Sequence, residues 1–83
     1  MRLGVMPRFF FHLRNDMSVD DAEGQELPDI DAARSCAIKY AQDMAAASIL
    51  EHGKINLHHR IEVADGGGIV LTVEFGDVVT VES

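Results

Sequence analysis

Imidazole side chains are the groups in this chain best suited to proton transfer or metal binding near neutral pH. The chain has four histidines in 83 residues. His58 and His59 are adjacent, so in an extended segment they point to opposite faces, and they lack the spacing of a helical metal-binding pair. His12 meets His58 or His59 only if the strands that carry them are neighbours in a suitable register. A histidine site formed by His12, His58 and His59 is therefore one hypothesis; exposed or hydrogen-bonded histidines are the alternative.

The other reactive residues do not complete a familiar site. Residues 16–23 are acidic, but an EF-hand loop needs glycine and glutamate at positions where the chain has Asp21 and Leu27. The glycines at 66–68 are followed by neither the lysine nor the helix that would hold a phosphate. Cys36, the single cysteine, has no second thiol and lies mid-helix on an apolar flank. We therefore expect no catalytic residue, no metal site and no cofactor.

Hydrophobic periodicity divides the chain into strands and one helix. Alternation predicts a strand over 7–14 and a weaker, acidic strand over 19–27. Apolar residues at three-to-four spacing predict a helix from Ile30, after an Asp29 N-cap, to His52 before Gly53. Two more strands are predicted over 60–64 and 69–75, joined by a glycine hairpin. Residues 76–83 either extend the last strand or add a short one.

The predicted order is β-β-α-β-β, a two-layer α+β sandwich. A right-handed crossover through the helix gives a four-stranded antiparallel sheet of order 2-1-3-4, with strands numbered along the chain and one long helix on one face. A chain of this length has room for a single core. We expect residues 1–5 to be an N-terminal extension and residues 6–83 to be one domain.

Composition narrows the function classes. Hydrophobic residues make up 47% of the chain and the mean hydropathy is +0.03, which is typical of a folded domain. No apolar run approaches the roughly 18 residues of a membrane span, so we expect a cytoplasmic protein with no membrane contact. The net charge is -7, with acids concentrated in residues 15–31. This charge argues against nucleic acid as a partner, because binding depends on neutralising phosphates.

Two surfaces are candidates for partner contact. Basic and aromatic residues alternate on the face of the first strand that the helix leaves uncovered. With residues of the last strand they form a candidate interaction face: Arg8, Phe10, His12, Arg14, Val70 and Thr72. The apolar arc of the helix is wider than one sheet face needs, and its surplus is a candidate helix-flank interface: Cys36, Tyr40 and Ala47. The alternative for the sheet face is an amphipathic, solvated surface.

The string MPRFFFHLR at residues 6–14 and DAEGQELPD at residues 21–29, followed by an alanine-rich helix, resemble a known family. RIEV at residues 60–63, the glycine hairpin and Phe75 continue the resemblance. The family is a domain of unknown function, found in small uncharacterised proteins of rhizobial and related alphaproteobacteria. The resemblance implies a soluble bacterial protein that begins at the Met-Pro pair, and it assigns no catalytic or binding residue.

Residues 9–46 are also similar to HicB-type antitoxins, in which a hairpin with a Leu-Pro-Asp-like turn leads into an alanine-rich helix. That similarity implies an antitoxin whose acidic stretch, residues 16–31, masks a basic toxin or RNase. Three hypotheses follow. We expect a small non-enzymatic interaction or regulatory module, plausibly a homodimer; the alternatives are this HicB-like antitoxin and a small histidine- or metal-dependent enzyme.

Overall fold

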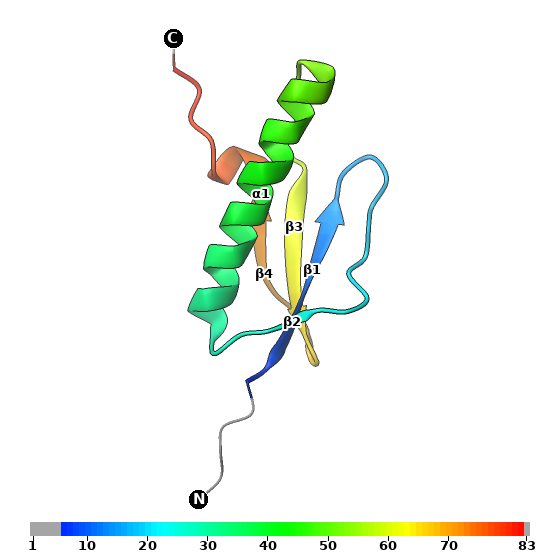
Figure 1. Ribbon diagram of the computed structural model, residues 1–83, viewed down its shortest axis with the longest axis vertical. Helices are drawn as coiled ribbons and strands as arrows, with labels where there is room; N and C mark the ends of the chain where they lie inside the picture. The colour runs from blue at the N-terminus through cyan, green and yellow to red at the C-terminus, as the bar shows by residue number, and fades with distance from the viewer. Residues whose placement is uncertain (1–5, 83) are drawn as a thin grey trace, which may run out of the picture.

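The computed structural model describes residues 6–82, in which one helix packs on a four-stranded antiparallel sheet (Figure 1). The elements are β1 (Arg8–Arg14), β2 (Gln25–Glu26), α1 (Ile30–His52), β3 (Arg60–Asp65), β4 (Gly68–Glu74) and a 3₁₀ helix, η1 (Phe75–Asp77). The sheet order is β2-β1-β3-β4. The predicted α+β class and strand order are therefore confirmed. The predicted extension, residues 1–5, lies outside the described residues, as does Ser83.

The centre of the sheet is the pair β1 and β3, whose side chains alternate between two faces. Phe9, Phe11 and Leu13 pack in the core with α1 and are at most 9% exposed. Val63 lies opposite Phe11 and Ile61 opposite Leu13, and both are fully buried. Cross-strand neighbours share a face, so these five residues form one apolar layer under the helix.

Helix α1 begins and ends where its capping residues predict. The Asp29 side chain accepts a hydrogen bond from the Ala32 N–H at 2.8 Å, and Gly53, with φ 70°, donates its N–H to the Ile49 carbonyl. The face against the sheet is made of small residues that are at most 1% exposed: Ala33, Ala37, Ala41 and Ala45. Their size lets the helix axis approach the sheet closely. Within residues 6–82, no helix is both long and apolar enough to cross a lipid bilayer.

The second strand is much shorter than the predicted 19–27. Only Gln25 and Glu26 pair with β1, and Val19 makes an isolated bridge to Leu13. Between them, the Phe11 N–H donates to the Asp21 carboxylate rather than to a strand carbonyl. The acidic residues that weaken the strand pattern therefore replace the ladder with side-chain bonds.

Strand β4 departs from regular alternation near its start. The register skips Val70, and Ala64 of β3 pairs with Ile69, which is a β-bulge. Because Ala64 also pairs with Phe10 of β1, Ile69 lies on the open face of the sheet. The alternation had predicted Ile69 beside Leu71 on the helix side, and the bulge is the reason for the difference.

The chain turns away from the sheet after Glu74. The Glu74 N–H donates to Asp77 Oδ2 at 2.9 Å, so Phe75, the predicted last residue of the fourth strand, instead begins η1. The Phe75 side chain is 2% exposed and contributes to the core. Residues 78–82 form no strand, so the predicted extension of the sheet by the C-terminal segment does not occur within the described residues.

Candidate functional site

The predicted interaction face on β1 carries charged side chains that are paired within the chain. Arg14 donates from Nε to Glu62 Oε1 at 2.8 Å and from Nη1 to Asp20 Oδ1. The pKa of Arg14 is raised, mainly by its hydrogen bond to Asp20 and secondly by its hydrogen bond to Glu62. The hydrogen bond from Arg14 in turn lowers the pKa of Glu62. Arg8 is bound by a carboxylate and a backbone carbonyl of residues 23–26. These guanidinium groups already have anionic partners.

The loop between β1 and β2 runs along the outer edge of β1 and is held by Asp21. Its N–H donates to Nδ1 of His12 at 3.0 Å, and its carboxylate accepts from the N–H groups of Phe11, Glu23 and Gly24 at 3.0 to 3.1 Å. Burial raises the pKa of Asp21, but these backbone hydrogen bonds outweigh it and the pKa lies below its ordinary value. The acidic loop is thus a fixed part of the domain.

Phe10, at the centre of the predicted face, lies against the same loop. Its ring stacks on His12 with ring centroids 6.5 Å apart and planes 7° apart. A Cβ on Gly24 would lie 2.8 Å from Phe10 Cε2, so the loop backbone touches the ring. The β1 part of the predicted face is therefore occupied by the chain itself, whereas Val70 and Thr72 of β4 remain exposed.

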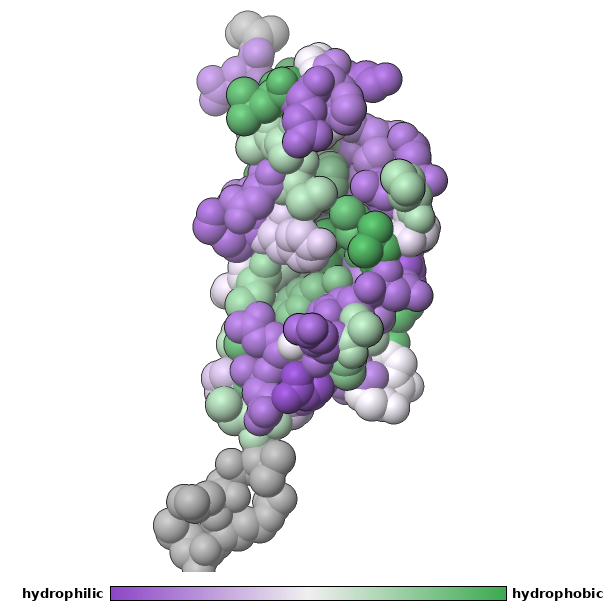
Figure 2. Space-filling model, turned by 45° about the vertical axis from the view of Figure 1, so that its right-hand side comes forward, coloured by the Kyte–Doolittle hydropathy of each residue, from purple (hydrophilic) through white to green (hydrophobic). Residues whose placement is uncertain are grey.

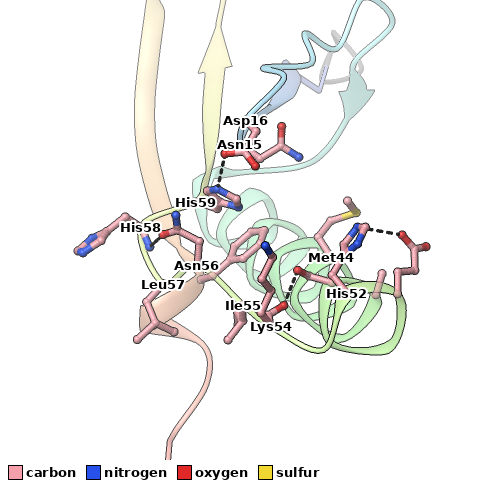
Figure 3. A pocket seen from close by; sticks show the side chains of 14 residues that line it. Asn15, Asp16, Met44, His52, Lys54, Ile55, Asn56, Leu57, His58 and His59 are labelled. Carbon is pink, nitrogen blue, oxygen red and sulfur yellow. Dashed lines mark hydrogen bonds and ion pairs between the residues drawn. The ribbon is translucent and has the colours of Figure 1, made fainter.

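Of the three histidines of the predicted site, His12 lies apart from His58 and His59. His12 is on the open face of the sheet, with Nδ1 accepting from a backbone N–H. His59 precedes β3 in a cavity against α1, with Nε2 3.4 Å from Asp16 Oδ1. His58 also lines that cavity, and its side chain is 90% exposed (Figure 3). Among residues 6–82, no group of three or more His, Cys, Asp or Glu side chains is placed to hold a metal ion.

The predicted helix flank is divided between two hollows. Cys36 and Tyr40 line a groove of about 580 Å³ together with Phe11 and Val19. In the space-filling view, hydrophobic surface lies in the hollow beside the helix, bordered by hydrophilic side chains (Figure 2). Ala47 lies instead in the cavity at the C-terminal end of α1. The helix-flank interface of Cys36, Tyr40 and Ala47 stays a prediction.

The cavity at the C-terminal end of α1 has a volume of about 680 Å³. Its apolar wall includes Met44, Ile55 and Phe75, and its polar rim includes Asn15 and Asn56 (Figure 3). Sequence reasoning missed both asparagines. A signal was present, because one directly follows β1 and the other precedes β3, and antiparallel neighbours bring those two ends together.

The outer edge of β4 is the other feature that stands out. Ile69 and Val70 are 58% and 44% exposed. In the part of the chain described, β4 pairs with β3 on one side and with no strand on the other. Sequence reasoning placed Val70 on the candidate face but missed the edge. The signal was the run GIVLTVE, a strand-forming sequence that contains neither lysine nor proline.

Residues 8–76 match a family described as a domain of unknown function, DUF6894. The chain belongs to this family. No curated protein and no solved structure matches the chain. The expected alphaproteobacterial origin and the similarity to HicB-type antitoxins stay predictions.

The limits of the DUF6894 match coincide with the folded elements. It begins at the first residue of β1 and ends within η1, so it includes the whole sheet, the helix and the buried Phe75. The edge of β4 and all the residues that line the cavity at the end of α1 lie inside the DUF6894 match. Both features are thus part of the family domain.

Proposed function

We propose that this DUF6894 domain is a non-enzymatic interaction module that associates with a second copy of itself through the edge of β4. The observation that supports the proposal is the exposed strand Gly68–Glu74. An open edge presents unpaired N–H and C=O groups, and natural sheets usually blunt such edges with lysine, proline or a covering segment. Within residues 6–82, β4 has a bulge near its start, contains neither lysine nor proline, and pairs with no strand on its outer side.

A second copy suits this edge because β4 is complementary to itself. In an antiparallel pair with a two-fold axis at Thr72, each Leu71 lies opposite Val73 of the other copy. The two threonines face each other, and Glu74 lies opposite Val70. Opposed pairs share a face in the regular part of the strand, and no like charges meet. The same strand therefore supplies both halves of a symmetric contact.

The pairing of acidic residues within the chain supports this proposal over an antitoxin-like role. The Asp20 carboxylate accepts a hydrogen bond from Arg14, and the Asp21 carboxylate accepts hydrogen bonds from three backbone N–H groups. A surface that mimics a polyanion needs carboxylates that are free to meet basic groups on a partner. Most exposed apolar surface on the sheet lies instead on β4, at Ile69 and Val70.

The test is the solution mass of the protein by light scattering over a concentration series. We expect a dimer that Thr72→Lys weakens by at least about tenfold, because two lysines then face each other across the two-fold axis. Leu50→Lys is the control, since it makes the same charge change at a side chain 86% exposed near the end of α1. Circular dichroism verifies that each variant is folded.

Two further chains test the register itself. An equimolar mixture of Thr72→Lys and Thr72→Glu is expected to recover the dimer mass, because opposite charges then meet at the axis. Val70→Lys is expected to be tolerated, because it faces Glu74 of the other copy. A wild-type monomer at every concentration would refute self-association. If Leu50→Lys abolished the dimer and Thr72→Lys did not, the contact would be formed by α1 and not by the edge of β4.

A further inference from the structure

Residues 19–24 of the loop between β1 and β2 form a strap beside the outer edge of β1 (Figure 1). Two backbone hydrogen bonds of 2.7 and 2.8 Å join Val19 to Leu13. Farther along the strap, the Asp21 N–H donates to Nδ1 of His12 at 3.0 Å. The bonds between backbone groups do not change with pH, whereas an imidazole gains a proton near neutral pH. The strap is therefore held in part by a titratable acceptor.

The direction of the bond to His12 determines the protonation state of the ring. A backbone N–H can only donate, so Nδ1 must present its lone pair to the Asp21 N–H. The imidazole is therefore neutral in this closed arrangement, with its proton on Nε2. A proton added at Nδ1 would place two donors against each other. The His12 side chain is 18% exposed, so the ring is open to protons from solvent.

The charged groups around His12 come from the strap, from β3 and from β1 itself. On the strap, Asp20 Oδ1 lies 3.8 Å from Nδ1, and the Asp21 carboxylate is occupied by backbone N–H groups. On β3, Glu62 lies opposite His12, but both of its oxygens accept from arginine Nε groups. On β1, Arg14 donates to the same Asp20 oxygen. An ionised oxygen accepts more than one bond, so Asp20 is placed to accept from a protonated Nδ1 as well.

We propose that the strap is a proton-controlled switch: when His12 gains a proton, Nδ1–H donates to the Asp20 carboxylate and the Asp21 N–H is released. The two atoms need to approach by about 1 Å to form an ordinary charge-assisted hydrogen bond. Asp21 also accepts from the Phe11 N–H through its carboxylate, so its movement frees that backbone donor at the edge of β1. One proton thus exchanges one set of bonds for another.

The strap also forms one wall of a groove of about 580 Å³. Asp20 and Asp21 line this groove on one side, and Cys36 and Tyr40 of α1 line it on the other. Release of the strap therefore widens the groove. The strap lies at the β2 side of the sheet and β4 is the opposite edge, so the switch does not depend on self-association.

Proton linkage sets the size of the effect. The closed strap admits no proton at Nδ1, whereas an imidazole free of that bond takes one up at about pH 6.5. The ratio of released to closed strap is therefore expected to rise about tenfold from about pH 7.5 to about pH 5.5. The pKa of Asp20, lowered mainly by its hydrogen bond from Arg14, lies below its ordinary value of 3.8, as does that of Asp21. Neither carboxylate changes charge in this range.

The experiment is amide hydrogen exchange of the full chain, followed by two-dimensional NMR from about pH 7.5 to about pH 5.5. Exchange rates are divided by the intrinsic rates to give protection factors. We expect protection of the Asp21 and Phe11 amides to fall about tenfold, while that of Ile61, at the centre of the sheet, changes by less than about twofold. Constant protection of Asp21, or an equal fall at Ile61, would overturn the inference.

A second measurement on the wild-type protein needs no variant. A long-range ¹⁵N–¹H correlation spectrum at about pH 7.5 identifies which ring nitrogen of His12 carries the proton. We expect the proton on Nε2, because Nδ1 accepts from the Asp21 N–H. A proton on Nδ1 would also overturn the inference.

His12→Asn is the discriminating variant. The amide oxygen takes the place of Nδ1 as acceptor from the Asp21 N–H but gains no proton in this range. We expect protection of the Asp21 amide to become independent of pH. His52→Asn, the matched control, removes an imidazole that is 60% exposed at the end of α1 and is expected to keep the wild-type response. A wild-type response in His12→Asn, or its loss in His52→Asn, would show that His12 is not the sensor.

Discussion

Asp21 is the single side chain whose replacement tests most of the loop architecture at once. Its Oδ1 accepts from the N–H groups of Glu23 and Gly24, and its Oδ2 accepts from the N–H of Phe11. In Asp21→Asn only one oxygen remains. If that oxygen keeps the two loop bonds, the new NH₂ group lies where Oδ2 accepted from Phe11, and two donors face each other. The opposite orientation of the new side-chain amide would be less stable, because its NH₂ group would then face the two N–H groups of Glu23 and Gly24.

The expected cost follows from these contacts. Leaving a half-buried backbone donor unsatisfied costs about 1 to 3 kcal/mol, and the two remaining bonds lose the extra strength of an ionised acceptor. Because the carboxylate is partly exposed, solvent recovers some of this, and we take about 2 kcal/mol as the loss. For a domain of this size, that lowers the melting temperature by about 8 to 16 °C.

The assay is thermal and urea unfolding of wild type, Asp21→Asn and Glu23→Gln. Glu23→Gln is the control, because it removes the same charge from the same loop at an exposed side chain. We expect it to change the free energy of unfolding by less than about 0.5 kcal/mol. Losses of equal size in the two variants would refute the reasoning, since charge and not hydrogen bonding would then explain the effect.

The pH profile gives a second readout for Asp21. Its pKa in the folded protein lies below the ordinary value of 3.8, so its ionised carboxylate stabilises the fold above about pH 4. That contribution is lost as the pH falls through the folded-state pKa. The stability difference between wild type and Asp21→Asn is therefore expected to narrow below about pH 4. A difference that stays constant down to about pH 2 would contradict the proposed ionised hydrogen-bond acceptor.

Two further pairs of variants test packing, each by urea unfolding. Gly24→Ala is expected to lower the free energy of unfolding by about 2 kcal/mol or more, because the new Cβ would lie 2.8 Å from the Phe10 ring. Gly53 also has a positive φ, but no atom lies within 4 Å of its Cβ position. Gly53→Ala is therefore expected to cost only about 1 kcal/mol. Ala37→Leu, at a fully buried helix position, is expected to cost about 1 to 3 kcal/mol, and Ala46→Leu on the exposed face less than about 0.5 kcal/mol. Equal losses within either pair would contradict the packing described here.

The parts of the fold that the sequence predicted are those governed by local periodicity. The alternation of Phe9, Phe11 and Leu13 identified the buried face of β1, and the Asp29 and Gly53 caps bounded the helix correctly. The strand order followed because a right-handed crossover through the helix leaves β1 between β2 and β3. Each of these rules depends on residues close together in the chain or on a general constraint of chain geometry.

The parts that could not be predicted depend on competition between distant groups. Residues 19–27 have some strand character, but the Asp21 carboxylate takes the Phe11 N–H that a longer β2 would have used. The bulge that moves Ile69 to the open face is an irregularity of the β3 and β4 register, and the alternating sequence gives no sign of it. The cavity at the end of α1 is similar, since its wall combines residues of α1, of the connection to β3 and of the loop after β1.

The two edges of the sheet differ in a way that bears on function. On the β2 side, the pairing strand is two residues long and the loop after β1 covers the edge. The Asp21 carboxylate also accepts a hydrogen bond from the backbone N–H of Phe11. These are the devices by which sheets avoid pairing with other chains. Apart from its bulge, the β4 side shows none of them among the described residues, although its sequence is the more apolar of the two. This difference between the two edges supports the proposal that the β4 edge is a contact surface, and the Thr72 variants test that proposal directly.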